Sequence, residues 1–245
     1  MPHPIRIGIG GWTYEPWRGT FYPSGLRQAD ELAFAARALT TIEVNGTYYG
    51  TQKPETFAKW AKETPDGFVF TLKAPRFATA RRVLAEGTES ITRFLASGLT
   101  ELGPKLGPIN WQLPPTKKFD PADVAAFLDL LPDRLEGLPL RHAIEARHDS
   151  FACDEFTTLL RDRNIAAIQA EDTDYPLIDA ATAPFAYLRI MGTREAEPLG
   201  YSEADLDRWA TRLRDMAAAR EVFLFVISGH KAANPAAALA LIQRL

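Results

Sequence analysis

The sequence predicts an α/β protein, built as a single TIM-type (β/α)8 barrel. Two observations carry this prediction: apolar segments of strand length alternate with helical patterns along the chain, and eight such strands accompany seven clear helices. No internal repeat, low-complexity run or linker divides the 245 residues. We therefore expect one domain spanning residues 1–245.

The predicted strands are the apolar runs at residues 5–10, 41–45, 68–73, 109–113, 142–147, 166–170, 185–190 and 222–228. The predicted helices are residues 28–38, 54–63, 89–101, 121–131, 153–163, 202–218 and 235–245. Pro121 and Pro235 suit a first helical position, and Ser202 to Asp205 resembles a capping box with Asp in place of Glu.

The connection between the sixth and seventh strands is the weak unit of this pattern. Residues 172–184 have room only for a turn or a short helix, so we expect a short or irregular connection there. A doubly wound open sheet is the structural alternative. It usually places a Gly-rich phosphate loop after strand one, and Gly8-Ile9-Gly10-Gly11 lacks the G-x-G-x-x-G spacing.

Composition excludes several classes of protein. Hydrophobic residues make up 46% and charged residues 24% of the chain, as in an ordinary globular protein. A net charge of -3 removes the usual compositional argument for nucleic-acid binding. Cys153 is the single cysteine, so no intrachain disulfide can form. No apolar run reaches the roughly 20 residues of a membrane span, and Met1-Pro2-His3-Pro4 leads directly into a strand; we expect a cytoplasmic protein without a membrane partner.

The second strand becomes polar as it ends, and this is the most informative feature of the chain. Ile42 and Val44 share one face, whereas Glu43 and Asn45 share the other, because side chains alternate along a strand. A buried carboxylate and amide are costly unless they are paired. Tyr48 follows at once, so the segment predicts part of a ligand pocket.

The same alternation recurs in the other strands. Their presumed inner faces carry Thr71 and Lys73, Asn110 and Gln112, Glu145 and Arg147, Gln169 and Glu171, Tyr187 and Arg189, and finally Ser228. The opposite faces carry Leu72, Trp111, Ile144, Ala146, Ala170, Leu188, Ile190, Phe225 and Ile227. We expect a polar ring at the carboxyl-terminal mouth of the barrel, where active sites lie in this fold. The alternative is a self-satisfied polar network that plugs the mouth.

Loops at the same end add aromatic and cationic side chains. The loop after strand one contains Trp12, Tyr14 and Trp17, and aromatic platforms bind sugars or unstacked bases. Arg76 follows strand three, and His230 follows strand eight, shortly before the helix that starts near Asn234. Loops after the last two strands commonly form the phosphate site of such barrels, which favours a phosphate or carboxylate ligand.

The chain resembles the YecE-like family, domain-of-unknown-function family 72, over nearly its whole length. The matching segments are Ile7-Gly8-Ile9-Gly10-Gly11-Trp12, Trp17-Arg18-Gly19, Phe21-Tyr22-Pro23, Ile42-Glu43-Val44-Asn45, Tyr48-Tyr49, Trp60, Thr64-Pro65, Phe70-Thr71-Leu72-Lys73-Ala74-Pro75-Arg76-Phe77, Gln112-Leu113-Pro114-Pro115, Ile144-Glu145-Ala146-Arg147-His148 and Tyr187-Leu188-Arg189-Ile190-Met191-Gly192. The resemblance implies a TIM barrel, and the family has no established biochemical activity.

Three positions depart from the family pattern. Met191 takes the His position of a usual Arg-x-His-Gly, and Phe225-Val226-Ile227-Ser228 replaces Phe-x-Asn-Asp. A frequent family His is absent at about Ala80, whereas Asn234 retains the last Asn of the family pattern.

Two function classes stay open. The first is a hydrolase or lyase acting on a phosphorylated or sugar-containing ligand, with Glu43 and Glu145 as acid/base residues. Two carboxylates on nonadjacent strands would also suit glycoside hydrolysis. The substrate-binding candidates are Trp12, Asn45, Tyr48, Lys73, Arg76, Gln112, Arg147, Arg189, His230 and Asn234.

The second class is a non-catalytic barrel that binds nucleic acid or a small ligand. Trp12, Tyr14, Trp17, Tyr48 and Tyr49 would stack bases, while Arg76, Arg81, Arg82 and Lys231 met phosphates. Nucleic acid is not favoured, given the acidic net charge. A divalent metal held by Glu43, Glu145, His148, Glu171 and His230 is a less favoured variant, because no compact metal motif is present.

Overall fold

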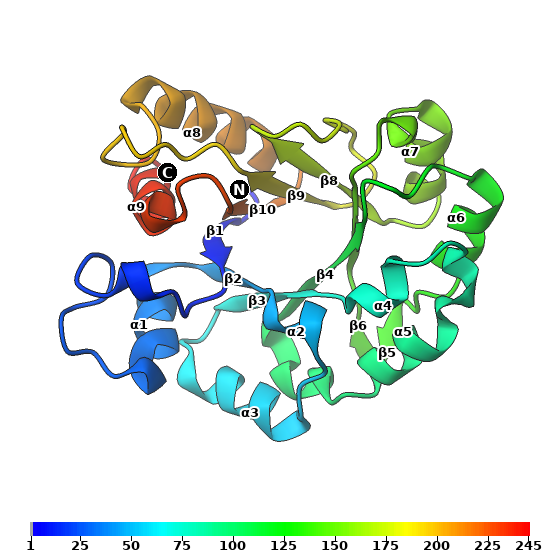
Figure 1. The fold of residues 1–245 in the computed structure, drawn as a ribbon, viewed down its shortest axis with the longest axis horizontal. Coiled ribbons are helices and arrows are strands. Elements are labelled where there is room, and N and C mark those ends of the chain that lie inside the picture. Colours follow the sequence, from blue (N-terminus) through cyan, green and yellow to red (C-terminus); the bar gives the residue numbers. More distant parts are fainter. Residues whose placement is uncertain (1) are drawn as a thin grey trace.

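Eight parallel strands close into a barrel in the computed structural model, which describes residues 2–245. The order around the barrel is β1-β10-β9-β8-β7-β4-β3-β2, with the helices arranged around it (Figure 1). The strands are β1 Ile5–Gly10, β2 Thr41–Val44, β3 Val69–Lys73, β4 Leu106–Leu113, β7 His142–Ala146, β8 Ala166–Glu171, β9 Phe185–Ile190 and β10 Glu221–Val226. The predicted (β/α)8 barrel is confirmed, and the open doubly wound sheet is excluded by the closure.

The α-helices are α1 Glu31–Ala38, α2 Gly46–Tyr49, α3 Pro54–Glu63, α4 Arg76–Thr79, α5 Thr88–Leu95, α6 Pro121–Leu128, α7 Asp154–Arg161, α8 Glu203–Ala217 and α9 Asn234–Ile242. Short 3-10 turns are η1 Glu15–Trp17, η2 Gln28–Asp30, η3 Leu84–Gly87, η4 Leu99–Lys105, η5 Asp149–Phe151 and η6 Lys231–Ala233. The helix predicted at 89–101 is wrong in length: Gly98 takes φ 89°, a left-handed conformation that ends the helix and starts a 3-10 segment.

Two predicted helix starts are confirmed by their caps. Asp120 Oδ1 accepts hydrogen bonds from the backbone N–H groups of Ala122 and Asp123 at 3.1 and 3.2 Å. Ser202 Oγ accepts from Asp205 N at 3.1 Å and donates to Asp205 Oδ2 at 2.8 Å. These contacts satisfy N–H groups that a helix leaves unpaired at its start.

The connection between β8 and β9 is irregular, as predicted: residues 172–184 form no helix or strand. A second irregularity was not predicted. A small hairpin, β5 Arg134–Leu135 with β6 Leu138–Pro139, precedes β7. Its two turn residues, Glu136 and Gly137, both have positive φ (48° and 83°), which suits a tight hairpin turn.

The barrel interior is apolar toward the amino-terminal ends of the strands and polar at its carboxyl-terminal mouth. The apolar plug consists of Val69, Ala143, Ala166, Ile168, Phe185, Tyr187, Phe223 and Phe225. The rings of Tyr187 and Phe225 lie 5.0 Å apart between centroids. These side chains fill the amino-terminal part of the barrel interior, below the polar mouth.

Several predicted side-chain directions are wrong. Phe225 and Ala170 are both in register with Arg189 and share its inward face, and Ile227 packs against the interior plug. Gln169 and Glu171 instead face outward and accept hydrogen bonds from Arg212 of α8. On β8, the polarity of the side chains did not indicate which of them point into the barrel. The reason is that Arg212 of α8, on the outer surface, supplies the partner for the polar ones.

No helix in the described part of the chain, residues 2–245, has the length and apolarity that a membrane crossing requires.

Candidate functional site

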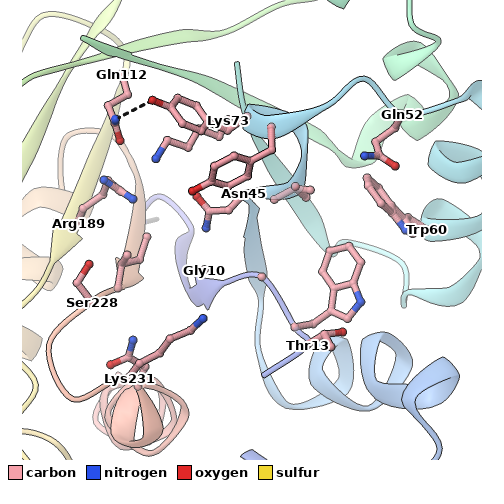
Figure 2. A pocket seen from close by; sticks show the side chains of 18 of the residues that line it. Gly10, Thr13, Asn45, Gln52, Trp60, Lys73, Gln112, Arg189, Ser228 and Lys231 are labelled. Carbon is pink, nitrogen blue, oxygen red and sulfur yellow. Dashed lines mark hydrogen bonds between the residues drawn. The ribbon is translucent and has the colours of Figure 1, made fainter. Parts of the chain in front are cut away.

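A pocket of about 780 Å³ opens at the carboxyl-terminal ends of the barrel strands (Figure 2). It gathers residues from β1 and its loop, from the β2–α2 junction, and from the ends of β3, β4, β7, β9 and β10. The predicted site residues that line it are Trp12, Asn45, Tyr48, Lys73, Gln112, Arg147, Arg189 and Asn234. Close packing at its base requires Gly10, where an added Cβ would lie 2.8 Å from Asn45 Nδ2.

The pocket is cationic. Lys73, Arg147, Arg189 and Lys231 line it, and the lining residues, all within the described chain, include no Asp or Glu. The chain as a whole carries a formal charge of -3, so this concentration of positive charge is local. Low-dielectric walls strengthen such a field and attract anions.

The two predicted catalytic carboxylates lie beneath this pocket rather than in its wall. Glu43 and Glu145 are fully buried, and both bind Arg189. Arg189 Nη1 donates to Glu145 Oε1 and Oε2 at 2.7 and 2.6 Å, and Nη2 donates to Glu43 Oε1 at 3.1 Å. One guanidinium therefore bridges carboxylates from two separate strands, and we call these three side chains the ion-pair layer.

Neutral donors complete the shell of Glu43. Tyr187 Oη donates to Glu43 Oε2 at 2.5 Å, and Asn110 Nδ2 donates to the same oxygen at 3.2 Å. Burial and the neighbouring Glu43 raise the pKa of Tyr187 well above its usual value. Tyr187 therefore remains a protonated donor. Each carboxylate oxygen of Glu43 accepts at least one hydrogen bond.

Glu145 is held as an anion by the cations around it. Arg147 Nε and Nη2 donate to Glu145 Oε1 at 2.9 and 2.8 Å. Burial alone would raise the pKa of Glu145, but Arg189, Arg147 and Lys73 outweigh it and lower that pKa to about 2. In return, the two carboxylates raise the pKa of Arg189 against the effect of its burial.

Lys73, at the end of β3, makes no hydrogen bond or ion pair through its amine within the described residues, and the same is true of Lys231. Lys73 is 8% exposed, and its Nζ lies 4.6 Å from the centroid of the Tyr48 ring. Burial, with Arg189 next in size, lowers the pKa of Lys73 to about 8. Figure 2 shows Lys73 beside Gln112 and Arg189. The Tyr48 hydroxyl accepts a 3.5 Å hydrogen bond from Gln112 Nε2.

A second group of residues lies around the start of α9. Lys231 Nζ sits 4.2 Å from the centroid of the Tyr14 ring, and burial lowers its pKa. Asn234 Oδ1 accepts from Thr193 Oγ1 at 2.8 Å, which leaves the Asn234 amide nitrogen without a hydrogen bond inside the described chain. Ser228, one of the departures from the family pattern, lines the pocket with φ 64°.

Some predicted contacts do not form. Arg76 is exposed on α4, with its guanidinium 5.0 Å from the Phe77 ring centroid, and neither it nor His230 lines the pocket. Trp17 is buried and donates from Nε1 to the Lys231 carbonyl at 2.9 Å, so it cannot stack on a base. Trp12 does face the cavity and packs edge-on against Trp60, with ring centroids 5.1 Å apart.

The predicted substrate-binding set missed Lys231, Trp60 and Gln52 of the lining. Lys231 carried a usable signal, because it lies three residues before Asn234 in a loop already singled out. Trp60 and Gln52 come from α3 and the segment before it, and neither has a strand-end position that would mark it in sequence.

The five residues considered for a metal site do not converge. Glu171 faces α8, and His148 Nδ1 accepts from Ser150 N at 3.1 Å in the cap of η5. Across residues 2–245, no three His, Cys, Asp or Glu side chains are grouped so that they could hold a metal ion.

Fold and site together define a (β/α)8 barrel with a cationic pocket at its strand ends. The family model described as protein of unknown function DUF72 matches residues 6–245, and the chain belongs to this family.

Relatives and solved structures agree with this membership. The UPF0759 protein YecE of Escherichia coli strain K12 is 31% identical over 150 residues, which is 60% of this chain and 50% of that protein; the chain thus spans about half the length of the curated relatives it matches. The crystal structure of a DUF72 family protein from Thermotoga maritima has a TM-score of 0.76 at 25% identity, covering 98% of both chains.

A DUF72 family protein from Enterococcus faecalis has a TM-score of 0.75 at 20% identity, covering 99% of this chain and 98% of that one. A xylose isomerase-like TIM barrel fused to a 4-hydroxyphenylpyruvate dioxygenase has a TM-score of 0.57 at 13% identity, covering all of this chain and 42% of that chain. These two likenesses support the barrel fold.

Proposed function

We propose that this protein is an enzyme of the hydrolase or lyase type that acts on a small anionic ligand, phosphorylated or sugar-containing. The single observation that carries the proposal is the charge of the pocket: four cationic side chains line it, and its lining within the described residues includes no carboxylate. A phosphate or carboxylate is the chemical group that such a pocket stabilises best.

Two polar atoms in or under the pocket wall lack partners. Arg189 Nε and Gln112 Oε1 are buried and form no hydrogen bond within the described structure. A buried polar atom without a partner costs about 1–3 kcal/mol. A ligand with both an anionic oxygen and a hydroxyl group would satisfy such atoms.

Aromatic side chains supply a surface that suits a sugar ring. Trp12, Trp60, Tyr48 and Tyr49 line the same cavity as the four cations. The side chain of Tyr49 is 72% exposed, so it stands at the rim, where it can cover a bound ligand. The combination of aromatic and cationic side chains favours a sugar phosphate or a sugar acid over a bare inorganic anion.

The ion-pair layer supports a positioning role for the two carboxylates. A glycoside hydrolase needs both carboxyl groups beside the scissile bond, and neither Glu43 nor Glu145 lines this cavity. Glu145, with a pKa lowered to about 2, is a poor proton donor near neutral pH. Both residues instead hold Arg189 in one orientation toward the ligand. The amine of Lys73 is then the pocket group best suited to take part in the reaction.

Binding of matched charged and neutral ligands tests this proposal. Native mass spectrometry and thermal unfolding would compare glucose 6-phosphate, gluconate, glucose, mononucleotides and short oligonucleotides. We expect retention and a raised melting temperature with the sugar phosphate or sugar acid and none with glucose. Equal binding of glucose and its charged analogues would contradict an anion-selective pocket.

A non-catalytic nucleic-acid-binding barrel is the second candidate. Two exposed aromatic side chains, Tyr49 and Phe77, favour it. Phe77 is 59% exposed and lies beside the Arg76 guanidinium. However, nearby cations already have partners within the protein: Arg81 Nε donates to the Phe77 carbonyl at 2.9 Å, and Lys117 Nζ donates to Asp123 Oδ2 at 2.5 Å. Affinity for oligonucleotides that falls steeply with salt would support this candidate; absence of binding at low salt would remove it.

A further inference from the structure

Lys73 occupies a fixed position at the rim of the ion-pair layer. It is the last residue of β3, and alternation places it on the inward face together with Val69 and Thr71. On the β4 side Lys73 pairs with Asn110, and on the β2 side Thr47 Oγ1 donates to the Lys73 carbonyl at 2.7 Å. An amine carried on a paired strand is presented in one place, as catalysis by a side chain requires.

Lys73 is 8% exposed as a whole residue, yet its amine has no polar partner within the described chain. Within residues 2–245, its Nζ makes no hydrogen bond or ion pair and lies over the face of the Tyr48 ring. Lys105, which is less buried, differs: its Nζ donates to the carbonyls of Ala61 and Thr64 at 2.6 Å each. Lys73 also lines the pocket, so its amine is available to a bound ligand.

Burial is the main cause that favours the neutral amine of Lys73. Arg189 and Arg147 add to it by repelling the ammonium form, whereas Glu43 and Glu145, which are engaged by Arg189 in the layer below, oppose it. With a pKa of about 8, roughly a tenth of the Lys73 side chains are neutral at pH 7. A lysine desolvated next to another cation is an activated nucleophile.

We propose that Lys73 condenses with the carbonyl group of a keto or aldehyde ligand, forming a Schiff base, while Arg147 and Lys231 hold the ligand's phosphate or carboxylate. The inference rests on the proposed function, because it names the substrate class and the covalent step of the same pocket. It also favours a lyase over a hydrolase, since an iminium ion withdraws electrons from an adjacent bond and promotes its cleavage.

The step balances without a further reactant. The neutral Nζ attacks the carbonyl carbon, so that a C–N bond forms while the π electron pair moves to oxygen. Proton transfer from nitrogen to that oxygen gives a carbinolamine. The proton that the ammonium form first released to water then returns to the hydroxyl, so that the C–O bond breaks and the oxygen leaves as water. The ammonium form and the carbonyl compound thus give an iminium ion and one water molecule, and nothing is oxidised or reduced.

Reductive trapping tests the inference. The full-length protein is incubated with dihydroxyacetone phosphate or pyruvate, and sodium borohydride then delivers hydride to the imine carbon, leaving a stable secondary amine. Peptide mass spectrometry locates the adduct. Glycerol 3-phosphate and lactate, which lack the carbonyl, serve as matched competitors, and their own binding is measured separately by native mass spectrometry.

We expect the adduct on Lys73 to exceed that on the exposed Lys53 and Lys118 by at least about tenfold, because each unit of lowered pKa raises the neutral fraction tenfold. A carbonyl-free competitor should protect it. Lys73→Arg, which keeps the charge, should abolish the adduct, whereas Lys231→Arg should retain it. If Lys73→Arg fails to fold, protection of the Lys73 adduct by the competitor in the wild-type protein still tests the Schiff base.

Two outcomes overturn the inference. If glycerol 3-phosphate or lactate binds but Lys73 is trapped no more than Lys53, the Schiff base is wrong and the anion pocket stands. If neither competitor binds and no adduct forms on Lys73, both the Schiff base and the proposed anionic ligand fail.

Discussion

Two layers of charge at the mouth of this barrel differ in whether each charge has a partner. In the ion-pair layer, every carboxylate oxygen of Glu43 and Glu145 accepts at least one hydrogen bond. In the pocket above, Lys73 and Lys231 contact aromatic ring faces. The difference indicates that the lower charges stabilise and orient the site, while the upper charges are free to bind.

The largest effect should come from removing the shared cation of the lower layer. Arg189→Ala leaves two buried carboxylates without their common partner, and breaking a buried pair costs about 3–5 kcal/mol. Urea unfolding at pH 7 would measure the loss. Arg189→Lys keeps the charge without the forked geometry and should be intermediate. An unchanged free energy of unfolding for Arg189→Ala would show that the layer does not support the fold.

A loss of about 3 kcal/mol at pH 7, at the low end of the range expected for Arg189→Ala, is expected for Glu145→Gln. The pKa of Glu145 is lowered from 4.5 to about 2 in the folded protein. Because the unfolded chain binds the proton more readily, this stabilisation is complete above pH 4.5 and is lost as the pH falls through about 2. The gap between wild type and variant in unfolding free energy should therefore narrow on acidification. A gap that stays constant from pH 6 to pH 3 would argue against a charge effect.

Removing an upper-layer cation should have the opposite sign. Lys73→Met replaces an unpaired buried amine by an apolar side chain of similar length, so we expect stabilisation of about 1 kcal/mol at pH 7. The pKa of Lys73 is lowered from 10.5 to about 8. Between these values the unfolded wild-type chain binds more protons, so wild-type stability rises with pH and the advantage of the variant shrinks. Destabilisation by Lys73→Met would place this amine with the paired charges.

The smallest effect on stability is expected at Lys231. Lys231→Gln removes a partly exposed cation that makes no ion pair in the described structure, so unfolding free energy should change by less than about 0.5 kcal/mol. Affinity for glycerol 3-phosphate, measured by calorimetry, should fall about tenfold or more, as expected for a hydrogen bond to a charged group. Arg244→Gln, on the far C-terminal segment, is the matched control and should leave affinity unchanged.

Much of this arrangement is predictable from the sequence. Alternation along β2, β3, β4, β7 and β9 correctly assigned Glu43, Lys73, Gln112, Glu145 and Arg189 to the barrel interior. It failed on β8, because Gln169 and Glu171 pair with Arg212 of a helix distant in the chain. It failed on β10, because the plug needs Phe225 inside, which polarity alone does not reveal.

Depth along the barrel axis was the other limit. Glu145 and Arg147 are two residues apart on one inner face, yet only Arg147 lines the pocket. Which inward residue reaches the cavity depends on the relative stagger of neighbouring strands, and that is set by packing across the barrel. The sequence therefore predicted the polar ring but not its division into a paired and an unpaired layer.

Titration of the Lys73 side chain tests this division most directly. Nuclear magnetic resonance of isotope-labelled lysine side chains, assigned with Lys73→Met, would follow the amine with and without saturating glycerol 3-phosphate. We predict a Lys73 pKa of about 8 for the free protein and an upward shift when the anion binds, because the new negative charge stabilises the ammonium form. A Lys73 that titrates near the ordinary value of 10.5 and does not respond to the anion would contradict this prediction.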